Sequence, residues 1–117
     1  MVVEYALHAQ EIDNMEETLS KVRNLGNFIQ KHGDDPFISR TITKMLEYKI
    51  QQYDEEIKRL NKDLERFEGT YHKESSGFFE EFKEGRAGDA MDFIEWASIY
   101  QMRNRLFERK AELEGKM

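Results

Sequence analysis

A chain of 117 residues, with 36% charged and 38% hydrophobic residues, fits one domain over residues 1–117 and leaves little room for an enclosed active-site cavity. The net charge of −6 disfavours binding to nucleic-acid phosphates, and the absence of cysteine excludes disulfides, thiol chemistry and cysteine-ligated zinc. The high charge content and the single proline are typical of long exposed helices, so we expect an all-α protein.

The first predicted helix spans residues 4–32. Apolar residues recur along it with the seven-residue repeat of a coiled coil, and His8 and Gly26 fill two slots of this seam. We interpret His8 as a polar seam residue rather than as a ligand. The N-terminus lacks a basic segment, and no apolar run approaches the roughly 20 residues that span a membrane, so we expect no signal peptide, no membrane contact and a cytoplasmic location. The seam comprises Tyr5, Ile12, Met15, Leu19, Val22 and Ile29.

The second predicted helix spans residues 36–68. Gly33 suits the left-handed position after a helix, Asp35 is a good N-cap and Pro36 fits the first helical position. The short connection favours an antiparallel, coiled-coil-like hairpin with the first helix. Because a two-helix hairpin buries little apolar surface, we expect hairpins to pair into a dimeric four-helix bundle. The predicted oligomerisation residues are Ile12, Met15, Leu19, Val22, Ile29, Ile50, Tyr53, Ile57, Leu60, Leu64 and Phe67.

A short helix over residues 76–84 and a final helix over residues 90–114 complete the predicted fold. We expect Ser75 or Ser76 to cap the short helix, Gly85 to end it, and Asp89 to cap the final helix. The final helix carries two adjacent apolar stripes, which indicates two packing neighbours. One stripe comprises Phe93, Trp96, Tyr100 and Phe107, and the other comprises Ile99, Met102, Leu106 and Leu113.

Carboxylates gather around the turn before the final helix, as a divalent-metal site or an acid–base pair would require. Asp89, Asp92 and Glu95 follow one another at three-residue steps. Di-metal carboxylate sites in helical bundles use a Glu-x-x-His pair, and no glutamate of this chain has a histidine three residues later. Acids at the start of a helix also stabilise it by opposing its dipole. We therefore expect no metal, no cofactor and no catalytic residue. A metal–carboxylate enzyme stays as a further hypothesis, ranked behind the two protein-interaction hypotheses given below, and stoichiometric metal after purification would support it.

The same region is the strongest candidate for binding another protein. From Glu74 to Glu95, seven acids stand against two bases, a net of −5, which favours a partner with a basic face. The aromatic residues have two compatible interpretations: a small satellite core that packs the last two helices onto the hairpin, and a recognition surface that anchors a partner. In the second interpretation the partner-binding residues are Phe78, Phe82, Asp89, Asp92, Phe93, Glu95, Trp96 and Tyr100.

Three stretches, "DDPFISRTITKMLEYKI", "LERFEGTY" and "SSGFFEEFKEGRAGDAMDFIEWASIYQM", together resemble a group of small helical prokaryotic proteins that are often the antitoxin-like halves of toxin–antitoxin pairs. The family pattern is a heptad helix ending in Phe-Glu-x-x-Tyr, a capped Phe-containing short helix, a Gly-x-x-Gly-Asp turn and an Asp-Phe-x-Glu-Trp helix. The likeness covers about residues 35–107 and departs at His72-Lys73, where the family usually has Gly-Met. The matching positions are Phe67, Glu68, Tyr71, Phe79, Phe82, Gly85, Gly88, Asp89, Asp92, Phe93, Glu95 and Trp96.

This resemblance implies a protein without catalytic activity that neutralises a co-encoded toxin. We therefore predict an antitoxin-like protein-interaction module that binds a basic protein partner through residues 78–100 and forms a homo-oligomer, with a dimer favoured. The alternative is a homo-oligomeric coiled-coil scaffold or chaperone-like clamp whose aromatic residues are buried within its own assembly. Trp96 discriminates between the two, because it is the only tryptophan and its exposure can be measured by fluorescence.

Overall fold

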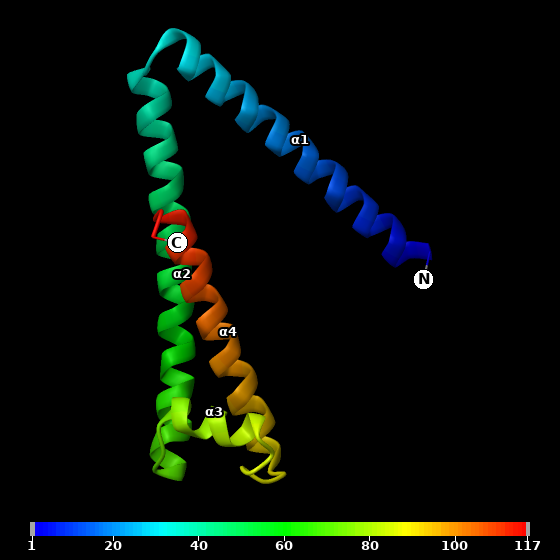
Figure 1. Cartoon of the computed structure of the whole chain (residues 1–117), viewed down its shortest axis with the longest axis vertical. Coiled ribbons are helices and arrows are strands. Elements are labelled where there is room, and N and C mark those ends of the chain that lie inside the picture. The colour runs from blue at the N-terminus through cyan, green and yellow to red at the C-terminus, as the bar shows by residue number, and fades with distance from the viewer. Residues whose placement is uncertain (1, 117) are drawn as a thin grey trace. The chain divides into compact units, whose positions relative to one another are not determined.

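The computed structural model describes the backbone of residues 2–116 and the side chains of residues 8–116, and over this range the fold is all-α, as predicted (Figure 1). Residues 2–116 contain no strand, and the seam residue Tyr5 lies outside the described side chains. Within the described part of the chain, no helix combines the length and the apolar content that crossing a membrane requires. The helices are α1 (Val2–His32), α2 (Pro36–Tyr71), α3 (Ser75–Lys83) and α4 (Met91–Leu113).

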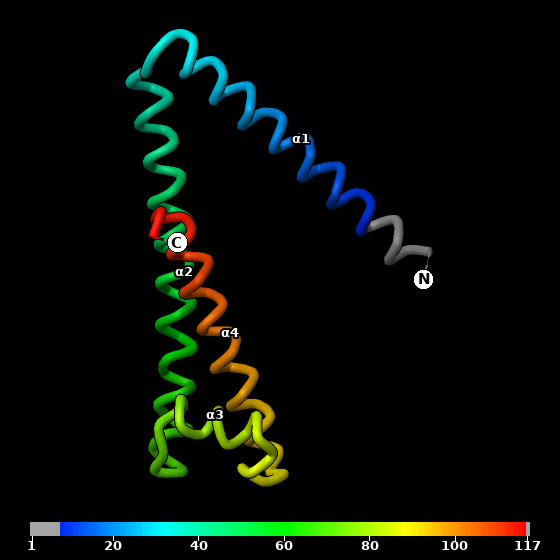
Figure 2. Tube along the Cα trace, in the orientation of Figure 1, coloured from blue at the N-terminus to red at the C-terminus, as the bar shows by residue number. Residues whose placement is uncertain are grey.

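The chain divides into two compact units, Met1–Thr43 and Lys44–Met117, with the boundary inside α2. Figure 2 traces the chain from α1 through the short turn into α2 and on to α3 and α4. The packing of α1 on α2 as a hairpin and the assembly of a dimeric bundle stay predictions. The organisation as a single domain likewise stays a prediction.

The turn between α1 and α2 forms as its sequence predicts. Gly33 has a φ of 88°, and its N–H donates a hydrogen bond to a carbonyl in the last turn of α1 (2.7 Å). This is the left-handed residue that commonly follows a helix. Asp35 Oδ1 accepts hydrogen bonds from the backbone N–H groups of Phe37 (2.9 Å) and Ile38 (3.1 Å). The predicted N-cap is therefore confirmed, since Asp35 satisfies two N–H groups that have no partner inside α2.

In the second unit, α4 runs antiparallel to the part of α2 that begins at Lys44 (Figure 1). Polar contacts at three levels join the two helices and set their register, because the residue number falls along α2 as it rises along α4. These contacts are Tyr71 Oη to Asp92 Oδ2 (2.7 Å), Arg103 Nη1 to Asn61 Oδ1 (3.2 Å) and Lys110 Nζ to Asp54 Oδ1 (2.7 Å).

This arrangement buries the α2 seam within the chain. Leu64 and Phe67 belong to one hydrophobic cluster with Trp96 of α4, and the register brings the buried Ile57 opposite the buried Leu106. Within the chain, α4 therefore covers this part of the α2 seam, and its covalent connection to α2 gives it a high effective concentration there. The other predicted oligomerisation residues of α2, Ile50, Tyr53 and Leu60, are half-buried.

The start of α3 differs from the prediction. The helix begins at Ser75 after Glu74, and no side chain of Glu74 caps it. Instead, Glu68 Oε2 in the last turns of α2 accepts a hydrogen bond from the Ser75 N–H (2.8 Å). The prediction that Ser75 or Ser76 caps α3 is wrong, because the chain reversal after α2 carries a carboxylate to this end, where it pairs a free N–H group and opposes the helix dipole.

The turn between α3 and α4 confirms one predicted feature and corrects another. Gly85 has a φ of 75°; its N–H donates to the Phe82 carbonyl (3.1 Å) and the Arg86 N–H donates to the Glu81 carbonyl (2.8 Å), which is the bonding of a Schellman motif. Gly85 therefore ends α3, as predicted. Asp89 does not cap α4, since the helix begins one residue later, with its N-cap at position 90 and no side-chain capping bond.

Candidate protein-binding site

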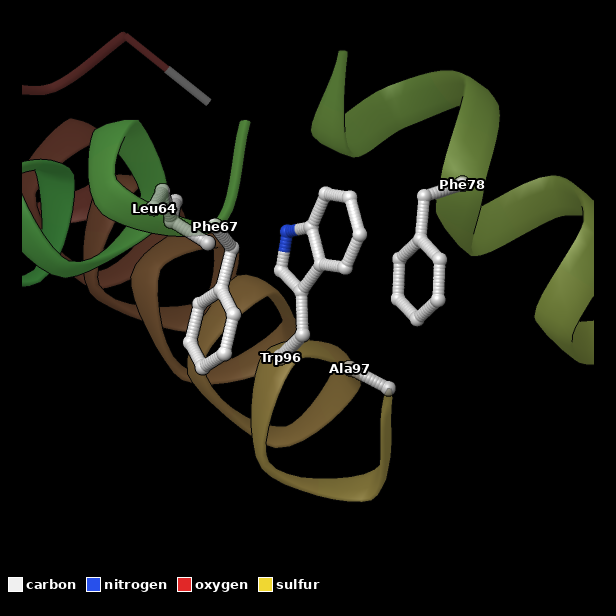
Figure 3. Close-up of a cluster of buried hydrophobic side chains, with 5 residues drawn as sticks. All are labelled: Leu64, Phe67, Phe78, Trp96 and Ala97. Atoms are coloured by element: carbon white, nitrogen blue, oxygen red, sulfur yellow. The ribbon is translucent and has the colours of Figure 1, made fainter. Parts of the chain in front are cut away.

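The aromatic residues of the second unit pack around Trp96, which is 0% exposed. Figure 3 shows its indole between the rings of Phe67 and Phe78. The Phe78 ring stacks on the indole with a centroid distance of 3.8 Å and an interplanar angle of 3°, and the Phe67 and Tyr71 rings stack at 5.6 Å. Because these rings come from α2 and α3, Trp96 of α4 is the side chain on which the three helices meet.

The polar edge of the indole is also satisfied. Trp96 Nε1 donates a hydrogen bond to Ser75 Oγ (2.9 Å), and Ser75 is itself only 3% exposed. The Ser75 N–H is bonded to Glu68, so α2 positions the first residue of α3, and that residue positions the indole. A buried donor that keeps its acceptor avoids the cost of lost hydration. These two hydrogen bonds fix the start of α4 relative to the end of α2 and the start of α3.

The structure separates the predicted partner-binding residues into groups. Phe78 and Trp96 are 2% and 0% exposed, so neither side chain can touch a partner in this conformation. Phe78 and Trp96 therefore belong to a small core, as the satellite-core interpretation predicted. The remaining aromatic members are half-buried and the acidic members are exposed; the first set is Phe82, Phe93 and Tyr100, and the second is Asp89, Asp92 and Glu95.

Two exposed apolar side chains stand beside these acids in sequence, and they are not among the predicted partner-binding residues. Met91 is 80% exposed and Ile94 is 55% exposed. They lie three residues apart in the first turn of α4, on the side away from Trp96. The sequence did contain a signal for their exposure, because neither Met91 nor Ile94 belongs to the two predicted apolar stripes of the final helix. A helix that buries two such stripes must expose its other apolar residues. We call Asp89, Met91, Asp92, Ile94 and Glu95 the acidic surface.

The carboxylates of α3 and of its C-cap residue Glu84 differ from those of the acidic surface in having cationic partners. Within residues 8–116, no lysine or arginine lies at ion-pair distance from Asp89, Asp92 or Glu95. The negative charge of the acidic surface is therefore available to a partner. The paired carboxylates are Glu80 with Lys83 (3.1 Å), Glu81 with Lys73 (2.8 Å) and Glu84 with Arg86.

Tyr71 holds one member of the acidic surface in place. Its hydroxyl donates to Asp92 Oδ2 (2.7 Å), and this bond favours the neutral phenol. The hydrogen bond raises the pKa of Tyr71 above its usual value, and burial and repulsion from the Asp92 carboxylate act in the same direction. The bond fixes Asp92 without cancelling its charge.

The turn that leads into the acidic surface depends on glycine. Gly85 and Gly88 have φ values of 75° and 102°, a conformation that other residues adopt only with strain. A Cβ atom at Gly88 would lie 3.7 Å from Phe93 Cε2, which is ordinary contact. The backbone conformation, rather than a lack of space, therefore requires glycine in this turn.

Two open hollows lie among the described residues of the second unit, and neither is an enclosed cavity. One of about 330 Å³ lies on α2 around Tyr53, and the other, of about 300 Å³, lies beside Phe79 and Asn104. Neither includes a residue of the acidic surface. Among the described residues, no group of three or more His, Cys, Asp or Glu side chains is placed to hold a metal ion.

Comparisons with known proteins found no matching family model, no similar curated protein and no similar solved structure. We therefore infer the function from the geometry of the acidic surface.

Proposed function

We propose that this protein is a non-catalytic, antitoxin-like interaction module that binds and neutralises a basic protein through segment 78–100. One observation supports the proposal most strongly: exposed apolar side chains and carboxylates without cationic partners stand together at the start of α4 and in the turn before it. Met91 and Ile94 are 80% and 55% exposed, and the three acids that flank them in sequence have no cationic partner among the described residues. An apolar centre with a charged rim is the usual anatomy of a protein interface.

The two kinds of side chain have different roles in this proposal. Burying a methionine or isoleucine side chain stabilises a complex by roughly 1.5–3 kcal/mol, so Met91 and Ile94 supply affinity. The carboxylates attract a partner rich in lysine or arginine and orient it on approach. Trp96 and Phe78 do not contact the partner. Their stacked rings join α4 to α3 and so support the acidic surface from the buried side of α4.

A second candidate function, a homo-oligomeric coiled-coil scaffold or chaperone-like clamp, is favoured by a separate observation. Trp96 is fully buried, as the scaffold hypothesis predicts, and the rings that cover it belong to its own chain. The burial does not conflict with partner binding through Met91 and Ile94, since these two side chains lie on the opposite side of α4.

The test is capture of the tagged full chain from its own cells, followed by reconstitution with the purified partner. We expect one small basic protein at near-equal stoichiometry, whose toxicity on expression is relieved by this chain. Met91→Ala with Ile94→Ala should abolish capture and relief. The matched control is Met45→Ala, which removes a methionine that is 61% exposed on α2 and should change neither.

Two results would refute the proposal. Recovery of the chain alone, as a stable oligomer, would establish the scaffold in its place. Equal binding of a partner by the wild-type chain and by the Met91→Ala, Ile94→Ala chain would show that the partner contacts another surface.

A further inference from the structure

The seam of α1 is an apolar stripe that its own unit, Met1–Thr43, leaves exposed. Ile12, Met15, Leu19 and Val22 are 39%, 55%, 46% and 59% exposed, and Ile29 is half-buried near the end of the helix. These residues follow the three-and-four spacing of a coiled coil. An amphipathic helix in water gains most of its stability from packing its apolar face, so this stripe requires a partner.

The charges of α1 are segregated along its length. Residues 8–17 carry four acids and no lysine or arginine, whereas residues 18–32 carry three bases and no acid. Two parallel copies would place acid against acid and base against base. Two antiparallel copies would place each acidic half against a basic half. The acids are Glu11, Asp13, Glu16 and Glu17, and the bases are Lys21, Arg23 and Lys31.

The residues that flank the seam give the same orientation. In an antiparallel pair Glu16 lies against Arg23 of the second copy, and this contact occurs twice. In a parallel pair Glu11 lies against Glu16 of the second copy, which is repulsive. Glu16 and Arg23 are exposed, and neither has an ion-pair partner within the described residues, so both are free to form the contact between chains.

Gly26 supplies a third argument. It fills a seam slot, and a Cβ atom built there has no neighbour within 4 Å. Parallel pairing would set Gly26 against Gly26 and leave a hole in the seam. Antiparallel pairing about the midpoint of Leu19 and Val22 sets Gly26 against Met15, whose long flexible side chain can fill the space.

We propose that α1 is a self-association surface through which two copies of this chain pair antiparallel over residues 12–29. The successive layers of the seam are Ile12–Ile29, Met15–Gly26, Leu19–Val22 and their symmetry mates. The assignment is independent of the proposed function, because it uses no residue of the acidic surface. It differs from a bundle built on both seams, since α4 already covers the α2 seam at Ile57, Leu64 and Phe67.

Sedimentation equilibrium of the full chain and three charge variants tests the orientation. The wild-type chain should be a dimer. Glu16→Arg should raise the dimer dissociation constant on the order of tenfold or more, because the introduced guanidinium would oppose Arg23 at two places. Adding Arg23→Glu should restore the dimer. Glu17→Arg is the control: it makes the same charge change on the outer face, where Glu17 pairs with Lys21 of its own helix (3.3 Å), and should leave the constant unchanged.

Each other outcome overturns the proposal. A tighter dimer with Glu16→Arg would establish parallel pairing, since the introduced guanidinium would then meet Glu11. An unchanged dimer would place the contact outside this seam. A monomer at every concentration would mean that the chain itself covers the face.

Disulfide trapping checks the register without changing charge, and the chain contains no cysteine to interfere. Chains carrying Ile12→Cys and chains carrying Ile29→Cys should cross-link when mixed, because these positions face each other. Neither should cross-link with itself, since identical positions lie roughly 25 Å apart along an antiparallel pair at 1.5 Å per residue, far beyond the reach of a disulfide. Self-cross-linking of Ile12→Cys chains, or no cross-link in the mixture, would overturn the register.

Discussion

Replacing Ser75 with alanine would test the polar bond at the centre of the aromatic core. Trp96 Nε1 donates to Ser75 Oγ at 2.9 Å, and the two residues are 0% and 3% exposed, so water cannot easily replace the lost hydroxyl. A buried donor left without an acceptor costs about 1–3 kcal/mol. We expect Ser75→Ala to lower the free energy of unfolding of the second unit by about 2 kcal/mol.

Urea denaturation followed by tryptophan fluorescence measures this effect, because Trp96 is the only tryptophan and reports on the second unit alone. The control is Ser76→Ala, which makes the same chemical change at the exposed neighbouring residue. A surface substitution of this kind should change the free energy of unfolding by less than about 0.5 kcal/mol.

A double-mutant cycle isolates the bond itself. Trp96→Phe removes the donor, so Ser75→Ala should cost about 1 kcal/mol less in that background than in the wild type. Circular dichroism follows unfolding of the chains that lack tryptophan. An equal cost in both backgrounds would show that Ser75 acts through packing or helix propensity, and the reasoning from the hydrogen bond would be refuted.

Three further predictions concern the turn after α2 and the ionisable pairs around it. His72 has a φ of 53°, which strains a residue other than glycine, and the Lys73 N–H donates to the Glu68 carbonyl as in a helix-ending turn. His72→Gly should therefore raise the free energy of unfolding in urea by about 1 kcal/mol. A lower free energy of unfolding would contradict the backbone strain. The pKa of Tyr71, measured by absorbance, should lie above the usual range of tyrosine, and Asp92→Asn should lower it. The hydrogen bond from Tyr71 to Asp92 therefore stabilises the fold below the usual tyrosine pKa. This stabilisation is lost as pH rises through the higher pKa of the folded state. The hydrogen bond from Lys73 lowers the pKa of Glu81, so this pair stabilises the fold above the usual glutamate pKa. The stabilisation is lost as pH falls through the lower pKa of the folded state. Lys73→Met should raise the pKa of Glu81 measured by NMR, and an unchanged pKa would exclude the pair in solution.

Local signals predicted the helix ends that depend on local chemistry. Asp35 and Gly85 act as predicted, because a cap and a left-handed glycine involve only residues within one turn. Ser75 was mispredicted because its N–H is satisfied by Glu68, seven residues earlier and on another helix. Pattern analysis within one helix cannot show such a bond. His72, where the sequence departs from the pattern that it resembles, adopts a left-handed backbone with a φ of 53°.

The acidic surface was predictable only in part. Asp89, Asp92 and Glu95 were selected from the sequence, and all three are exposed. For Trp96 the sequence left both a core position and a position in a binding surface open, because an aromatic residue in an acidic segment fits either. Its burial follows from the stacked ring of Phe78, which belongs to a different helix. Once Trp96 faces inward, the helical period turns Met91 and Ile94 outward.

The sequence alone determined that the chain is helical, where most helices begin and end, and which faces are apolar. Tertiary structure alone decided which apolar faces meet. Ile57, Leu64 and Phe67 are buried within the chain, because α4 returns along α2 after the reversal at α3. The physical reason is that a hydrophobic period records how much of a helix must be buried, whereas the partner is chosen by connection length, ring stacking and buried hydrogen bonds between distant residues.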